Sequence, residues 1–160
     1  MSHLKDDFII EVNHISKNFG SKCVLDDVSI SVKRGEFVTI LGPSGCGKTT
    51  LLKMINRLIE PTTGKILLNE TDITAHDPIE LRRNMGYVIQ QTGLFVHMTV
   101  RENIEIIPHL AKLPEDEIVE RTIKLMEMVG LPAEFLDRYP NHLSGGQQQR
   151  IGVARAFAMD

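Results

Sequence analysis

Apolar and polar side chains alternate along the first third of the chain, a pattern typical of half-buried β-strands. Residues 8–15 and 26–32 alternate in this way. The run EFVTIL at 36–41 is largely apolar, and we expect a buried strand there. KILLNE at 65–70 and GYVIQ at 86–90 also favour strands. The N-terminal part is therefore predicted to be rich in β-structure.

Helical spacing dominates the second half. Apolar positions with a period near 3.6 residues predict helices over residues 49–59, 77–85 and 113–130. Capping-box pairs, in which Ser or Thr is followed three residues later by Glu or Gln, predict two further helix starts, at Thr99 and Ser144. Together the patterns predict an α/β chain with a β-rich beginning, a central core and a helical lobe.

Composition narrows the class of protein. The chain has 160 residues, 42% of them hydrophobic and 24% charged, which is the length and composition of one globular domain. A net charge of −3 disfavours a nucleic-acid surface, which would be basic. No apolar run approaches the roughly 18 residues of a membrane span, and the acidic start MSHLKDDF is unlike a signal peptide. Cys23 and Cys46 are far apart, which favours reduced thiols over a disulfide framework.

The segment GPSGCGKT at 42–49 matches the phosphate-binding pattern G-x-x-x-x-G-K-[ST] between an expected strand and an expected helix. The loop's N–H groups would face an anion, with Lys48 on the β- and γ-phosphates and the Thr49 hydroxyl on Mg²⁺. Cys46 could be a redox-sensitive thiol, but a small residue whose backbone matters is the favoured interpretation. The expected nucleotide contacts come from Gly42, Pro43, Ser44, Gly45, Cys46, Gly47, Lys48, Thr49 and Thr50.

Two further motifs follow, YVIQQ at 87–91 and LSGGQ at 143–147. With the phosphate loop, they make the chain resemble the ATP-binding cassette (ABC) family over essentially its whole length. The resemblance implies a P-loop NTPase (RecA-like) core with an antiparallel β subdomain over about 1–92 and a helical subdomain over about 93–160. The interval from Gly47 to Ser144 leaves no room for the coiled-coil insertion of the related DNA-repair ATPases.

The resemblance also implies roles for individual residues. Phe19 matches the aromatic residue that stacks on adenine, and an ordinary core phenylalanine is the alternative. Gln90 matches the glutamine that contacts Mg²⁺ and the attacking water, with Gln91 as an off-by-one alternative. Lys48 and Gln90 are thus the expected catalytic residues, and Thr49 and Gln90 the Mg²⁺ ligands. In the family the LSGGQ loop closes over ATP held by a second subunit, in a head-to-tail dimer; its expected contacts are Ser144, Gly145, Gly146 and Gln147.

The stretches INRLIEPTTGKI and ELRRNMGYVIQQTGLFVHMTV resemble the ATPases of bacterial importers of glycine betaine, carnitine, choline and related osmoprotectants. Importers of amino acids or methionine, or a soluble non-transport cassette, are the alternatives. The resemblance implies a peripheral subunit on the cytoplasmic face of the membrane. Its expected partners are membrane permease subunits, contacted through residues 91–100, and indirectly an extracytoplasmic solute-binding protein, with no nucleic acid.

The family also has an Asp-Glu strand end and a switch histidine, which would lie beyond Asp160. We therefore expect the cassette core to be incomplete at its C-terminus. We also expect this 160-residue chain alone to bind ATP weakly and to turn over essentially none.

Overall fold

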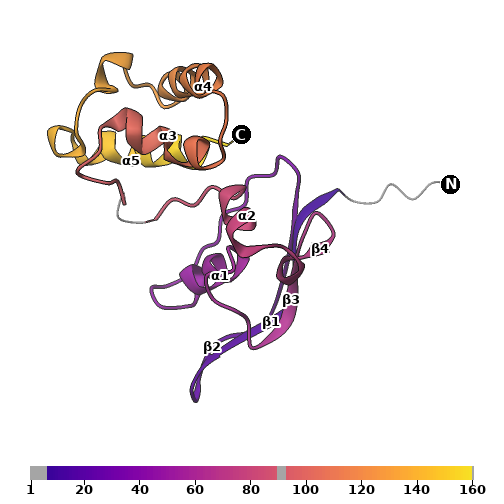
Figure 1. Ribbon diagram of the computed structural model, residues 1–160. Coiled ribbons are helices and arrows are strands. Elements are labelled where there is room, and N and C mark those ends of the chain that lie inside the picture. Colours follow the sequence, from indigo (N-terminus) through magenta and orange to yellow (C-terminus); the bar gives the residue numbers. More distant parts are fainter. Residues whose placement is uncertain (1–6, 90–92, 160) are drawn as a thin grey trace. The chain divides into compact units, whose positions relative to one another are not determined.

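The computed structural model describes residues 7–89 and 93–159. The chain divides into two compact units, Met1–Arg82 and Arg83–Asp160. Figure 1 labels the helices and strands of each unit. Each unit is described below by itself.

A four-stranded antiparallel sheet forms the first unit, in the order β2-β1-β3-β4. A two-residue turn at Gly20 and Ser21, with Gly20 at a φ of 59°, joins the two long strands. The sheet confirms the β-rich beginning expected from the alternating pattern, and its antiparallel pairing is the one that the family resemblance implies. The strand bounds are β1 Phe8–Phe19, β2 Lys22–Lys33, β3 Thr63–Leu68 and β4 Thr71–Asp72.

Three helical segments complete this unit: α1 Lys48–Ile55, the 3₁₀ turn η1 Ile73–Ala75 and α2 Pro78–Arg83. The Asp77 carboxylate caps α2, because it accepts from the N–H groups of Ile79 and Glu80. α1 ends four residues before the expected end at 59. The backbone leaves the helix after Ile55 and takes a positive φ of 52° at Arg57.

The strands expected at 36–41 and 86–90 are not formed in the described residues. Residues 36–43 and 86–89 have no regular secondary structure, and Phe37 and Leu41 are 93% and 86% exposed. A strand exists only where a neighbouring strand pairs with its N–H and C=O groups. In the described sheet, β1 to β4 pair with one another and not with either of these two segments.

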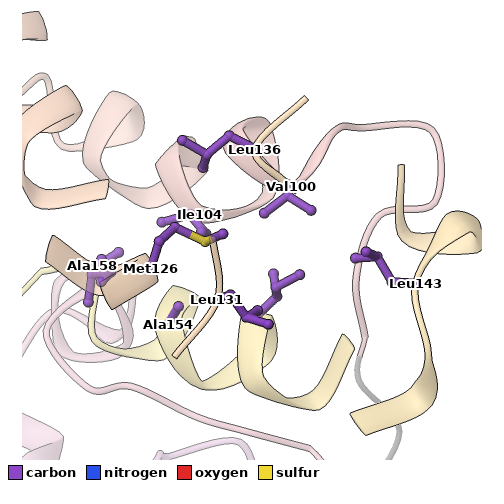
Figure 2. Close-up of a cluster of buried hydrophobic side chains, with 10 residues drawn as sticks. Val100, Ile104, Met126, Leu131, Leu136, Leu143, Ala154 and Ala158 are labelled. Carbon is purple, nitrogen blue, oxygen red and sulfur yellow. The ribbon is translucent and has the colours of Figure 1, made fainter. Parts of the chain in front are cut away.

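The second unit is helical and has its own core. Its elements are α3 Val100–Leu110, α4 Glu115–Met128, η2 Ala133–Phe135, η3 Pro140–His142 and α5 Gly145–Ala156. Both predicted capping boxes are confirmed at the starts of α3 and α5, and Gly130 follows α4 with a φ of 63°. Within the described part of the chain no helix is long and apolar enough to cross a membrane. The core, drawn in Figure 2, consists of Val100, Ile104, Leu125, Met126, Leu131, Leu136, Leu143, Ile151, Ala154 and Ala158.

Candidate functional site

A close contact between Gly47 and strand β2 holds the glycine-rich loop at residues 42–49, the P-loop. Gly47 precedes α1, is buried and has a φ of 98°. A Cβ atom on Gly47 would lie 2.6 Å from Cδ2 of Leu25 and 3.0 Å from the carbonyl oxygen of Val24. A residue with a side chain would meet both a strained backbone and a steric clash here. Glycine therefore allows the loop to turn into α1 directly against the sheet.

Lys48 bends back over the P-loop. Its Nζ donates to the carbonyl oxygens of Gly42 at 2.7 Å and Pro43 at 2.8 Å, and it lies 3.6 Å from Sγ of Cys46. The first N–H groups of α1 have no acceptor within the helix, and the helix dipole makes this end positive. An ammonium group beside a helix N-terminus, in a loop that is largely exposed, suits a phosphate chain.

Phe19 lies at the end of β1, on the hairpin that contacts the P-loop. Leu25 packs on Gly47 and pairs across the hairpin with Lys17. Lys17 lies two residues before Phe19 in β1. The Phe19 ring is 49% exposed, and Nζ of Lys17 lies 5.0 Å from its centroid. A half-exposed aromatic face that bears a cation can stack on a nucleobase. An ordinary core phenylalanine would be buried, so the exposure favours the stacking role expected for Phe19.

Thr49 is the only protein ligand for Mg²⁺ that we can suggest from the described residues. It is exposed and is the second residue of α1. Within residues 7–89 and 93–159, no group of three or more His, Cys, Asp or Glu side chains could hold a metal ion. A hydroxyl with no carboxylate cluster fits Mg²⁺ that keeps waters and is bound mainly through the phosphates of a nucleotide. Gln90 and its alternative Gln91 lie outside the described residues.

The LSGGQ segment, here called the signature loop (residues 143–147), forms the start of α5 in the second unit. The Ser144 hydroxyl accepts from the N–H of Gln147 at 3.3 Å, and Oε1 of Gln147 accepts from the N–H of Ser144 at 2.8 Å. Gly145 and Gly146 are exposed, and a Cβ atom on either would meet nothing within 4 Å. Packing within the chain therefore does not require glycine at either position.

Gln148 holds the backbone of the residues that lead into the signature loop. Its Nε2 donates to the carbonyl oxygens of Pro140 and Leu143 at 2.9 and 3.2 Å. Leu143 is buried in the core of the second unit. Gly145 and Gly146 therefore lie at the N-terminus of α5, on a loop held by hydrogen bonds, with open space next to them. This arrangement suits an anion bound to another molecule.

Asn103, which the sequence did not single out, holds the loop at residues 93–99 (the 93–99 loop). Its side chain is fully buried and makes four hydrogen bonds to this loop's backbone. Oδ1 accepts from the N–H of Phe95, and Nδ2 donates to the carbonyl oxygens of Phe95, Met98 and Thr99, at 2.8 to 3.1 Å. Its one sequence signal is a polar residue within the apolar period of α3. Phe95 and Val96 are 42% and 69% exposed, so this loop presents apolar side chains on a fixed backbone.

Arg155, in the last turn of α5, also binds this loop and was likewise not predicted. Nη1 donates to the carbonyl oxygen of Gly93 at 2.9 Å, and the guanidinium carbon lies 5.8 Å from the centroid of the Phe95 ring. Desolvation by burial lowers the pKa of Arg155 below its ordinary value, which still leaves it charged at neutral pH. The signature loop and the 93–99 loop are therefore linked through opposite ends of one helix.

A glycine-rich phosphate loop that leads into one helix, and a glycine signature at the N-terminus of a second, define a nucleotide-binding cassette of the P-loop class. The ABC transporter family model matches residues 25–160, and the chain belongs to that family. The resemblance drawn from the three motifs is thereby confirmed.

Curated relatives and a solved structure agree with this assignment. The carnitine transport ATP-binding protein OpuCA of Listeria monocytogenes is 56% identical over 95% of this chain and 38% of that protein. The choline transport ATP-binding protein OpuBA of Bacillus subtilis is 51% identical over 95% of this chain and 40% of that protein. A dimeric post-hydrolysis state of the ATP-binding cassette MJ0796, bound to ADP and Pi, matches with a TM-score of 0.82 and 35% identity over 93% of this chain and 69% of that one. The chain thus spans about two fifths of the length of these curated relatives.

Proposed function

We propose that the whole protein is the ATP-binding and ATP-hydrolysing subunit of a bacterial importer for quaternary amine osmoprotectants, peripheral on the cytoplasmic face of the membrane. One observation carries the choice of solute: relatives named for carnitine and choline transport are 56% and 51% identical over 95% of this chain. In the proposed transporter the cassette does not contact the solute, so the choice rests on these relatives.

The described geometry supports ATP with Mg²⁺ as the nucleotide complex. Lys48 and the N-terminus of α1 suit the phosphates, the exposed Phe19 ring suits the base, and Thr49 offers an oxygen to the metal. The other P-loop residues except Pro43, which has no backbone N–H, would contribute backbone N–H groups. Gln90 keeps its proposed role beside the metal and the attacking water. Lys48 and Gln90 are the proposed catalytic residues of this chain.

The signature loop supports a head-to-tail dimer with a second copy of the subunit. Gly145 and Gly146 have open space above their Cα atoms in this chain, and the solved relative is a dimer. Ser144, Gly145, Gly146 and Gln147 would then face nucleotide bound by the partner subunit. The exposed Phe95 and Val96 support contact with a membrane permease through residues 91–100. A solute-binding protein would act through that permease, and no nucleic acid takes part.

Uptake by the complete transporter tests this proposal. The full-length subunit and its permease would be expressed in a bacterial strain lacking osmoprotectant importers, and uptake of labelled carnitine, choline and methionine would be measured. We expect uptake of a quaternary amine, with none in the Lys48→Ala variant. Lys65→Ala is the matched control, because Lys65 is an exposed lysine on β3 of the same unit. Uptake of methionine alone would contradict the proposal that the solute is a quaternary amine. Failure of the subunit to co-purify with any membrane protein would favour a soluble cassette.

A further inference from the structure

The C-terminal turn of α5 contacts the chain on both sides of residues 90–92. On one side, a Cβ atom on Gly86 would lie 2.2 Å from the carbonyl oxygen of Ala156, so only glycine permits this close approach. On the other side, Nη1 of Arg155 donates to the carbonyl oxygen of Gly93. Arg155 and Ala156, which are consecutive in α5, thus contact Gly93 and Gly86, one on each side of residues 90–92.

The same helix begins at the signature loop. α5 runs without interruption from Gly145 to Ala156, and its buried residues Ile151, Ala154 and the nearby Ala158 anchor it in the core. A short, well-packed helix moves as a rigid rod because its interior is close-packed and resists deformation. A displacement imposed at Arg155 is therefore carried to Ser144 rather than absorbed along the helix.

We propose that Arg155 is a positioning residue that couples the 93–99 loop to the signature loop. A force applied to the loop at Phe95, where the guanidinium faces the ring, would reach the signature loop through α5. The loop is itself fixed by the four hydrogen bonds of Asn103, so it moves as a unit and not one residue at a time. The inference rests on the proposed function, because it takes the 93–99 loop as the surface that a permease contacts.

Arg150 provides a matched control on the same helix. Its Nη1 donates to the carbonyl oxygen of Gly130 at 3.1 Å, as Arg155 does to Gly93. Both acceptors are glycines with positive φ, 63° at Gly130 and 57° at Gly93. Arg150, however, binds the connection after α4 and not the 93–99 loop. Loss of either guanidinium removes a hydrogen bond from an arginine to a glycine carbonyl oxygen. Of these two arginines, only Arg155 binds the 93–99 loop.

The test compares Arg155→Met and Arg150→Met in the complete transporter, reconstituted in vesicles with its solute-binding protein and carnitine. We expect carnitine-stimulated ATPase activity of Arg155→Met to fall about tenfold, within the usual range of coupling effects, while its unstimulated activity changes less than about twofold. Arg150→Met should keep its stimulation. Arg155→Lys retains the charge and a donor without the planar fork, and should recover part of the stimulation even if Arg155→Met fails to fold. Full stimulation in Arg155→Met, or equal loss in Arg150→Met, would overturn the inference.

A second measurement separates this inference from the proposed function. Hydrogen exchange of the purified full-length subunit should be about tenfold faster at the amides of residues 94–98 in Arg155→Met, but unchanged there in Arg150→Met. If carnitine does not stimulate the unmodified transporter, the proposed function fails, and the exchange rates still decide whether Arg155 holds the loop. Unchanged exchange in Arg155→Met would overturn the inference whatever the transport result.

Discussion

Glycine serves two different purposes in this chain. Gly47 is required by the fold, because its positive φ and its contact with Leu25 leave no room for a side chain. Gly146 is exposed, and open space surrounds it. The P-loop pattern was visible in the sequence, but the contact with Leu25 was not, because it joins residues 22 positions apart whose approach depends on the folded hairpin.

This difference predicts opposite effects of the same substitution on stability. Gly47→Ala should lower the free energy of unfolding by about 3 kcal/mol, from left-handed backbone strain and overpacking. Gly146→Ala should change it by no more than about 1 kcal/mol, in the stabilising direction, because alanine favours a helix. Urea unfolding of the two variants beside the unmodified chain measures both values. Equal destabilisation by the two substitutions would show that the space around Gly146 is filled in solution.

Elements that depend on residues close together in the sequence were predicted well, and elements that need a partner far along the chain were not. The capping boxes at Thr99 and Ser144 each involve residues three apart, and both form as expected. The apolar run at 36–41 has the composition of a buried strand, but a strand also needs pairing that the sequence does not specify. Asn103 and Arg155 escaped prediction because they bind backbone groups of a loop whose conformation no sequence pattern reports.

The dependence of the 93–99 loop on α3 can be tested at Asn103. Asn103→Ala removes its four hydrogen bonds from the backbone groups of Phe95, Met98 and Thr99 and leaves a cavity at a fully buried position. The expected loss in the free energy of unfolding is about 2–3 kcal/mol, measured by thermal unfolding. Amide exchange at Phe95 should rise along with it. Asn141→Ala is the control, since Asn141 is an exposed asparagine of the same unit, and an equal loss in that variant would contradict the role of Asn103.

At the scale of the whole molecule, the P-loop and the signature loop belong to different compact units. In the proposed head-to-tail dimer, each nucleotide lies between the P-loop of one copy and the signature loop of the other. Lys48→Ala and a bulky change such as Gly146→Arg should each damage both sites of a homodimer. A mixed dimer, however, would bring both lesions to one site and leave the second site intact.

Mixing the two inactive full-length variants should therefore restore ATP-dependent association. Random pairing makes about half of the dimers mixed, and each has one intact site of its two, so about one quarter of the normal number of sites should return. Light scattering with ATP, using each variant alone as the baseline, measures the recovery. If the signature loop instead served the P-loop of its own chain, every subunit in the mixture would retain a damaged site and no recovery would occur. The mixing experiment thus distinguishes a signature loop that acts on a partner's nucleotide from one that acts within its own chain, without requiring a structure of the dimer.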